Sequence, residues 1–137
     1  GIAVGEAYTD FDEKIAHMRA LRNRMVCGLS DMENVVVHGM PGEEGAPHIV
    51  NAAFIGVGSE VLLHTLEERG IYVSAGSACS THKRSGSPTL TAIGAAKEEM
   101  SSSVRFSFSE LNTEDEVDET LRVLAEVIPM LRRYRRR

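Results

Sequence analysis

Two amphipathic helical patterns, one near each end of the chain, enclose a series of short strand patterns, and this order limits the possible folds more than any other feature. A stripe at steps of three and four predicts the first helix, with Phe11, Ile15, Met18, Leu21, Met25 and Leu29 on one side. The last helix is predicted from a second stripe of Val117, Leu121, Leu124, Ile128 and Leu131. Before it, Thr113 and Glu116 have the spacing of a capping box.

Between these helices the chain alternates strand and helix signals. Short apolar runs predict strands at Val35–Val37, His48–Phe54, Ile71–Val73 and Ser103–Phe108. A further helix is predicted from Ser59 to Gly70, with Val61, Leu62 and Leu66 turned inward. We expect an α+β fold: a small mixed or antiparallel sheet with helices layered on one face. The 137 residues suit one compact domain, so residues 1–137 are expected to form a single domain.

Charge and hydropathy exclude several classes of partner. Twenty acidic against 15 basic side chains give a net charge of -5, which argues against a nucleic-acid partner. No apolar run reaches the roughly 18 residues of a membrane span, and no targeting segment opens the chain, so we expect a cytoplasmic protein with no membrane contact. The C-terminal arginines are expected to be the solvated end of a helix; they are Arg132, Arg133, Arg135, Arg136 and Arg137.

Cys79 is the first candidate for chemistry. It lies in a run from Ser74 to Pro88 that is rich in serine and glycine and has almost nothing to bury, which is typical of a mobile loop. A thiol there is accessible, and the neighbours His82, Lys83 and Arg84 could stabilise its thiolate. The alternative is a cysteine that merely fills space, the role that we expect for Cys27 beside Met25 on the first helix.

Arg105 is the second candidate, because it interrupts the alternating run Ser103–Phe108. Its planar guanidinium can bind a carboxylate through two hydrogen bonds. The alternative is an arginine on the solvent face of an edge strand. The five histidines show no spacing typical of metal ligands, so no metal site is expected.

Several segments together resemble the C-terminal domain of a cysteine desulfurase of the NifS/IscS-like group, within the class-V aminotransferases. The segments are Val50–Asn51, Gly58–Leu63, Ser74–Ser80, Ser103–Phe108 and Thr113–Asp118, and they follow in the family's order over nearly the whole chain. The resemblance implies the small domain of a fold-type I pyridoxal-phosphate enzyme. Asn51 falls at a recurring asparagine of that family, to which we assign no chemistry.

The resemblance also implies a reaction and a place for two residues in it. L-cysteine would be converted to L-alanine, with Cys79 as the nucleophile that holds the persulfide and Arg105 as the group that binds the substrate carboxylate. The sulfur would then pass to an acceptor or scaffold protein for iron–sulfur cluster or other thio-cofactor assembly. The full-length enzyme is expected to be a homodimer.

The chain departs from the family in one large respect. The family's cofactor domain, with its Schiff-base lysine, lies N-terminal to the matched region, and none of Lys14, Lys83 and Lys97 stands in a matching cofactor motif. We therefore expect no cofactor-binding residue in this chain and no turnover by the chain alone. Two alternatives stay open: a selenocysteine lyase or other class-V aminotransferase, and a stand-alone interaction domain that carries a thiol.

Overall fold

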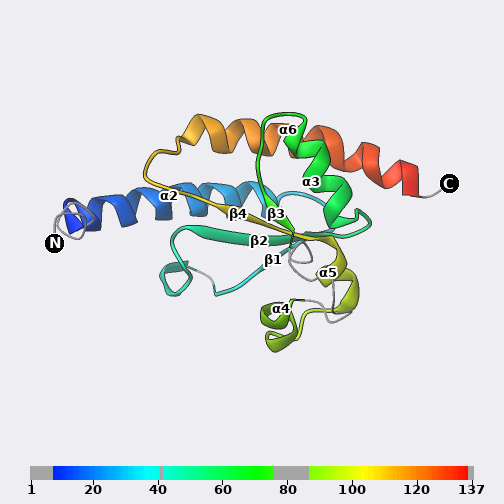
Figure 1. The fold of residues 1–137 in the computed structure, drawn as a ribbon, viewed down its shortest axis with the longest axis horizontal. Helices are drawn as coiled ribbons and strands as arrows, with labels where there is room; N and C mark the ends of the chain where they lie inside the picture. The colour runs from blue at the N-terminus through cyan, green and yellow to red at the C-terminus, as the bar shows by residue number, and fades with distance from the viewer. Residues whose placement is uncertain (1–7, 41, 76–86, 136–137) are drawn as a thin grey trace.

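A four-stranded sheet organises the computed structural model, which describes residues 8–40, 42–75 and 87–135 (Figure 1). Its strands are β1 (Val35–His38), β2 (Ile49–Phe54), β3 (Ser74–Ala75) and β4 (Ser103–Ser107). They lie in the order β1-β2-β4-β3, and each neighbouring pair is antiparallel. Because β4 lies between β2 and β3, those two strands run in the same direction and form a split β-α-β unit with α3 (Ser59–Glu67).

The long helices lie together on one side of this sheet. Figure 1 shows α2 (Phe11–Ser30), α3 and α6 (Glu114–Arg135) on one side, and α4 (Pro88–Ala92) and α5 (Lys97–Ser102) on the other. A short 3-10 helix, η1, spans Gly42–Glu44 between β1 and β2. The α+β prediction with helices layered on one face is therefore confirmed, and α5 is a helix that the sequence patterns did not predict. Within the described residues, no helix is long and apolar enough to cross a membrane.

The core lies between the sheet and the three long helices. Alternation along β4 directs Val104 and Phe106 into it, and both are almost fully buried. The ring of Phe106 meets that of Phe54 on β2 edge to face, with centroids 6.5 Å apart. Buried leucines complete the layer from the helices; they are Leu21, Leu29, Leu62, Leu66 and Leu124.

A glycine lies where α2 meets α6. A β-carbon at Gly28 would collide with the side chain of Leu121, so a larger residue there would require that leucine to shift. One turn away, Arg24 binds Asp118 through two hydrogen bonds of 2.6 and 2.8 Å. This hydrogen-bonded pairing holds the pKa of Asp118 below its usual value.

The predicted capping box at the start of α6 is confirmed. The Thr113 hydroxyl accepts from the Glu116 N–H at 3.3 Å, and the Glu116 carboxylate accepts from the Thr113 N–H at 2.9 Å. The Asn112 amide donates to the same carboxylate at 3.1 Å. These bonds hold the pKa of Glu116 below its usual value, with the Thr113 backbone bond as the main cause.

Two predictions for the region of α3 are wrong. Val61 is exposed, and the strand predicted at Ile71–Val73 is not formed; β3 begins at Ser74 instead. The strand is missing because of the way α3 ends: Gly70 adopts a positive φ of 76°, and the Ile71 N–H donates back to the Leu66 carbonyl at 2.9 Å. The backbone N–H of Ile71 therefore completes the helix terminus and is not free for a sheet.

The C-terminal arginines are not all solvated as predicted. Arg132 donates from Nε to the Ile55 carbonyl at 2.9 Å and from Nη2 to the Asn34 carbonyl at 3.0 Å. It thereby ties α6 to the end of β2 and the residue before β1. Arg133 is exposed, as expected. The side chain of Arg135 and residues 136–137 lie outside the described part of the chain.

Replacing Arg132 by alanine tests this contact. We expect Arg132→Ala to lower the free energy of unfolding by about 1–2 kcal/mol, because two carbonyls lose a charged donor. Arg133→Ala, at the exposed neighbouring position, is the matched control and should change it by less than about 0.5 kcal/mol. Urea unfolding followed by circular dichroism measures both; equal effects of the two variants would contradict the role of Arg132.

A second prediction concerns the free energy of unfolding at low pH. Because the folded pKa of Asp118 lies below its ordinary value of 3.8, its pairing with Arg24 stabilises the fold fully above that value. This contribution is lost as the pH falls through the lowered pKa. We expect Asp118→Asn to flatten the fall of unfolding free energy on acidification, and Asp31→Asn, at an exposed position, to leave it unchanged. Urea unfolding midpoints measured between about pH 2 and pH 6 check this prediction. It would be refuted if the midpoint of Asp118→Asn fell with pH as steeply as that of the wild type.

Candidate functional site

Polar side chains form a row across the sheet on the face opposite α2, α3 and α6. Each strand contributes one of them, in direct cross-strand register: His38 on β1 pairs with Asn51 on β2, Asn51 with Arg105 on β4, and Arg105 with Ser74 on β3. Side chains at directly opposed positions of antiparallel strands have β-carbons about 4.5–5.5 Å apart. The register therefore brings together residues that are far apart in the sequence.

Arg105 lies in the interior of the sheet and is exposed. The alternative of an edge strand is therefore wrong, because β2 and β3 flank β4. Its Nη2 donates to the Ser74 hydroxyl at 3.4 Å, a long bond, and no acidic side chain in the described part of the chain pairs with it. Most of its donors are thus available to a ligand with oxygen acceptors.

His38 has contacts at both ring nitrogens. Its side chain is only 8% exposed, and Nδ1 lies 2.8 Å from Oδ1 of Asn51 while Nε2 lies 3.0 Å from Oε2 of Glu99. The bond from His38, supported by the Ala96 N–H, holds the pKa of Glu99 below its usual value against the opposing effect of burial. At the end of the polar row, a buried histidine therefore contacts an amide on one side and a partly exposed carboxylate on the other.

Sequence reasoning did not single out His38 or Glu99. A signal existed for His38: it ends a run of three valines, and alternation places it and Val36 on the face away from the core. No signal marked Glu99, because it lies on α5, which was not predicted, and 61 residues separate it from His38. Only the packing of α5 against β2 brings the two together.

Cys79 lies outside the described residues, as do His82, Lys83 and Arg84 and most of the loop predicted from Ser74 to Pro88. The two ends of that segment are described: Ser74–Ala75 form β3, and the Ser87 hydroxyl accepts from the Leu90 N–H at the start of α4. Cys79 follows Ser74 by five positions in the sequence. Chain geometry alone thus keeps their α-carbons within about 18 Å of each other.

Cys27 does not have the packing role that was expected of it. It is a free cysteine and exposed, whereas Leu21, Met25 and Leu29 form the buried stripe of α2. Two positions after Met25 correspond to about 200° of rotation around a helix, which turns Cys27 away from that stripe. The apolar character of its neighbours in the sequence was therefore a poor guide to its burial.

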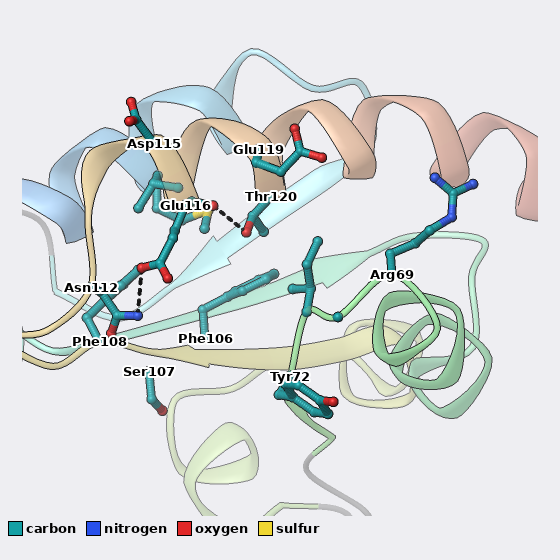
Figure 2. Close-up of a pocket in the computed structure, with 14 residues that line it drawn as sticks. Arg69, Tyr72, Phe106, Ser107, Phe108, Asn112, Asp115, Glu116, Glu119 and Thr120 are labelled. Carbon is teal, nitrogen blue, oxygen red and sulfur yellow. Dashed lines mark hydrogen bonds between the residues drawn. The ribbon is translucent and has the colours of Figure 1, made fainter.

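A pocket of about 530 Å³ lies beside α6 and the segment from Arg69 to Tyr72 (Figure 2). Phe106 lines it from β4 and Phe108 from the segment just after that strand, with Glu116 and Glu119 on α6 (Figure 2). Neither Arg105 nor the other members of the polar row line this pocket. Because alternate residues of a strand point to opposite faces, a pocket lined by Phe106 is separated by the sheet from the guanidinium of Arg105.

Two of the three lysines of the chain lie in the described residues. Lys97 is exposed at the start of α5, on the side of the sheet that carries the polar row, and Lys14 lies on α2, on the other side. Lys83 lies outside the described residues. Over the same described ranges, no group of three His, Cys, Asp or Glu side chains could hold a metal ion.

Comparison with known proteins finds similar sequences named cysteine desulfurase and similar solved structures. The chain is 37% identical over 135 residues to cysteine desulfurase IscS of Enterobacter sp. (strain 638), which covers 96% of this chain and 33% of that protein. A solved structure titled NifS-like protein superposes with a TM-score of 0.75 at 26% identity, over 91% of this chain and 30% of that one. The NifS-like protein of Rickettsia africae shares the fold, with a TM-score of 0.72 at 22% identity over 87% of this chain and 30% of that one.

The chain spans about a third of the length of the curated relatives that it matches. A sequence model of the class-V aminotransferases matches residues 5–120, which is most of the chain. The chain therefore belongs to the class-V aminotransferase family.

Proposed function

We propose that residues 1–137 are the small domain of a cysteine desulfurase, in which Cys79 takes the sulfur of L-cysteine and Arg105 binds the substrate carboxylate. The similarity to proteins named cysteine desulfurase supports this proposal and does not favour a selenocysteine lyase or a stand-alone interaction domain. The observation that carries it is the position of Arg105 next to Ser74 on one face of the sheet. A carboxylate site thereby lies at the start of the segment that contains Cys79.

Arg105 suits a carboxylate for chemical and structural reasons. A guanidinium presents parallel N–H groups that match two carboxylate oxygens, and the pair is stronger than a neutral hydrogen bond. An interior strand holds the arginine more firmly than a loop would. The guanidinium is also free of competing carboxylates among the described residues, so a substrate does not have to displace an existing ion pair.

Cys79 would act on a substrate held by Arg105. Its thiolate attacks the sulfur of L-cysteine, a sulfur–sulfur bond forms, and the carbon–sulfur bond of the substrate breaks. The electron pair of the broken bond stays on the substrate carbon, which takes up a proton. The sum is Cys79 thiol plus L-cysteine giving Cys79 persulfide plus L-alanine.

The remaining parts of the activity lie beyond this chain. Because none of the three lysines stands in a matching cofactor motif, we assign pyridoxal phosphate to the part of the family's length that this chain does not match. The protein would act in the cytoplasm as a homodimer, and its persulfide would supply an acceptor or scaffold protein for iron–sulfur cluster or other thio-cofactor assembly. The name IscS of the relatives is consistent with that use.

The test of the proposed function is a cysteine substitution in the full-length protein that contains this chain. We expect Cys79→Ser to abolish alanine release from L-cysteine, because a hydroxyl does not form a stable persulfide. Cys27→Ser is the control, since Cys27 is an exposed thiol on α2, and it should leave the rate unchanged. Mass spectrometry should find the added sulfur on the Cys79 peptide; alanine release that persists in Cys79→Ser would defeat the proposal.

Arg105 has a separate expected result. Arg105→Lys keeps the charge but loses the two-pronged geometry, so KM for L-cysteine should rise about tenfold. Arg69→Lys serves as the control, because Arg69 is an exposed arginine paired with Glu126 away from the polar row. Steady-state kinetics of alanine release measure both, and an unchanged KM in Arg105→Lys would remove Arg105 from the substrate site.

A further inference from the structure

Asn51 occupies the position between His38 and Arg105. Its Oδ1 contacts Nδ1 of His38 at 2.8 Å, and its backbone is in direct register with Arg105. Within the described ranges its Nδ2 makes no hydrogen bond, and the residue is half-buried. An amide with its oxygen held and its NH₂ group available, beside a guanidinium with no acidic partner among the described residues, is the arrangement of a second donor.

We infer that Asn51 is a second donor to the carboxylate bound at Arg105, and that the ion pair of His38 with Glu99 is a positioning device that fixes the direction of the Asn51 amide. The inference rests on the proposed function, because it takes Arg105 as the carboxylate site. It assigns a ligand contact to Asn51 and a positioning role to His38 and Glu99.

The protons on His38 determine how Asn51 is held. The Glu99 carboxylate can only accept a hydrogen bond, and the Asn51 carbonyl oxygen faces Nδ1, so the inferred arrangement has a proton on each ring nitrogen of His38. In that arrangement the ring is an imidazolium, and the Glu99 carboxylate compensates its charge where the His38 side chain is only 8% exposed.

This protonation leaves the amide one favourable orientation. With Oδ1 facing the imidazolium, the NH₂ group is at the other end of the amide and can donate only to a different partner. A neutral imidazole with a bare Nδ1 would favour the reverse, with the NH₂ group turned toward His38. Glu99 therefore affects ligand binding by way of His38, which orients the Asn51 amide, and does not itself touch the ligand.

Equilibrium binding to the full-length protein tests the contact without turnover. L-alanine carries the carboxylate, and L-alaninamide has nearly the same shape without the negative charge. We expect Asn51→Ala to weaken L-alanine binding about tenfold in titration calorimetry and to leave L-alaninamide binding unchanged. Asn23→Ala, at an exposed asparagine on α2, is the matched control and should change neither.

A double-mutant cycle tests the positioning role. Glu99→Gln removes the charge that compensates His38, so it should weaken L-alanine binding in the otherwise unchanged protein. If Glu99 acts through Asn51, the same substitution should have no further effect in the Asn51→Ala background. Additive losses would mean a general structural effect and would overturn the positioning role.

The outcomes separate this inference from the proposed function. If Arg105→Ala weakens L-alanine and L-alaninamide equally, the carboxylate site itself is refuted. If Arg105→Ala is selective for L-alanine but Asn51→Ala is not, the second donor alone is refuted. A measurement that needs no substitution completes the test: ¹⁵N NMR of His38 should give the signature of an imidazolium, and an unprotonated Nδ1 would overturn the orientation of Asn51.

Discussion

The pairing of β4 with β2 on one side and β3 on the other is the constraint on which the rest of the structure depends. It sets Arg105 opposite both Asn51 and Ser74. A shift of one residue in this register would turn Arg105 into the hydrophobic core and Phe106 toward solvent, because side chains alternate along a strand. Burial of Val104 and Phe106 on one face therefore fixes the polar row on the other.

The two faces of the sheet serve different purposes. The face beneath α2, α3 and α6 is apolar and closely packed; Arg132 ties α6 to the end of β2, and the Arg24–Asp118 pair ties α6 to α2. The opposite face is polar and only partly covered by α5, whose Glu99 reaches His38. A rigid layer thus supports an arginine that remains open to a ligand.

The pattern of the sequence was sufficient for most of the fold. The stripes of α2 and α6 and the alternation around Phe106 predicted elements that the structure contains, because periodicity reports burial directly. The failures at Val61 and at Ile71–Val73 have a different cause. Short apolar segments fit a strand, a helix terminus or an exposed turn equally well, and the tertiary contacts choose among them.

Some residues of the candidate site could likewise be predicted from the sequence, and others could not. Arg105 could be found from the sequence, because a charge inside an apolar alternating run is conspicuous, and Asn51 was noted through a family resemblance without a role. His38 and Glu99 could not be paired in advance, since their contact depends on how α5 packs against β2. Cys79 stays a prediction from the sequence, since it lies outside the described residues.

By itself, the sequence determined which segments are amphipathic and which residues carry reactive or charged groups, because these are local properties of the chain. Only the tertiary structure decided that four of these polar residues, one from each strand, form a single row. The physical reason is that backbone hydrogen bonds between strands align the residues of a sheet. The cross-strand neighbours of a residue are therefore set by strand register and not by distance along the chain.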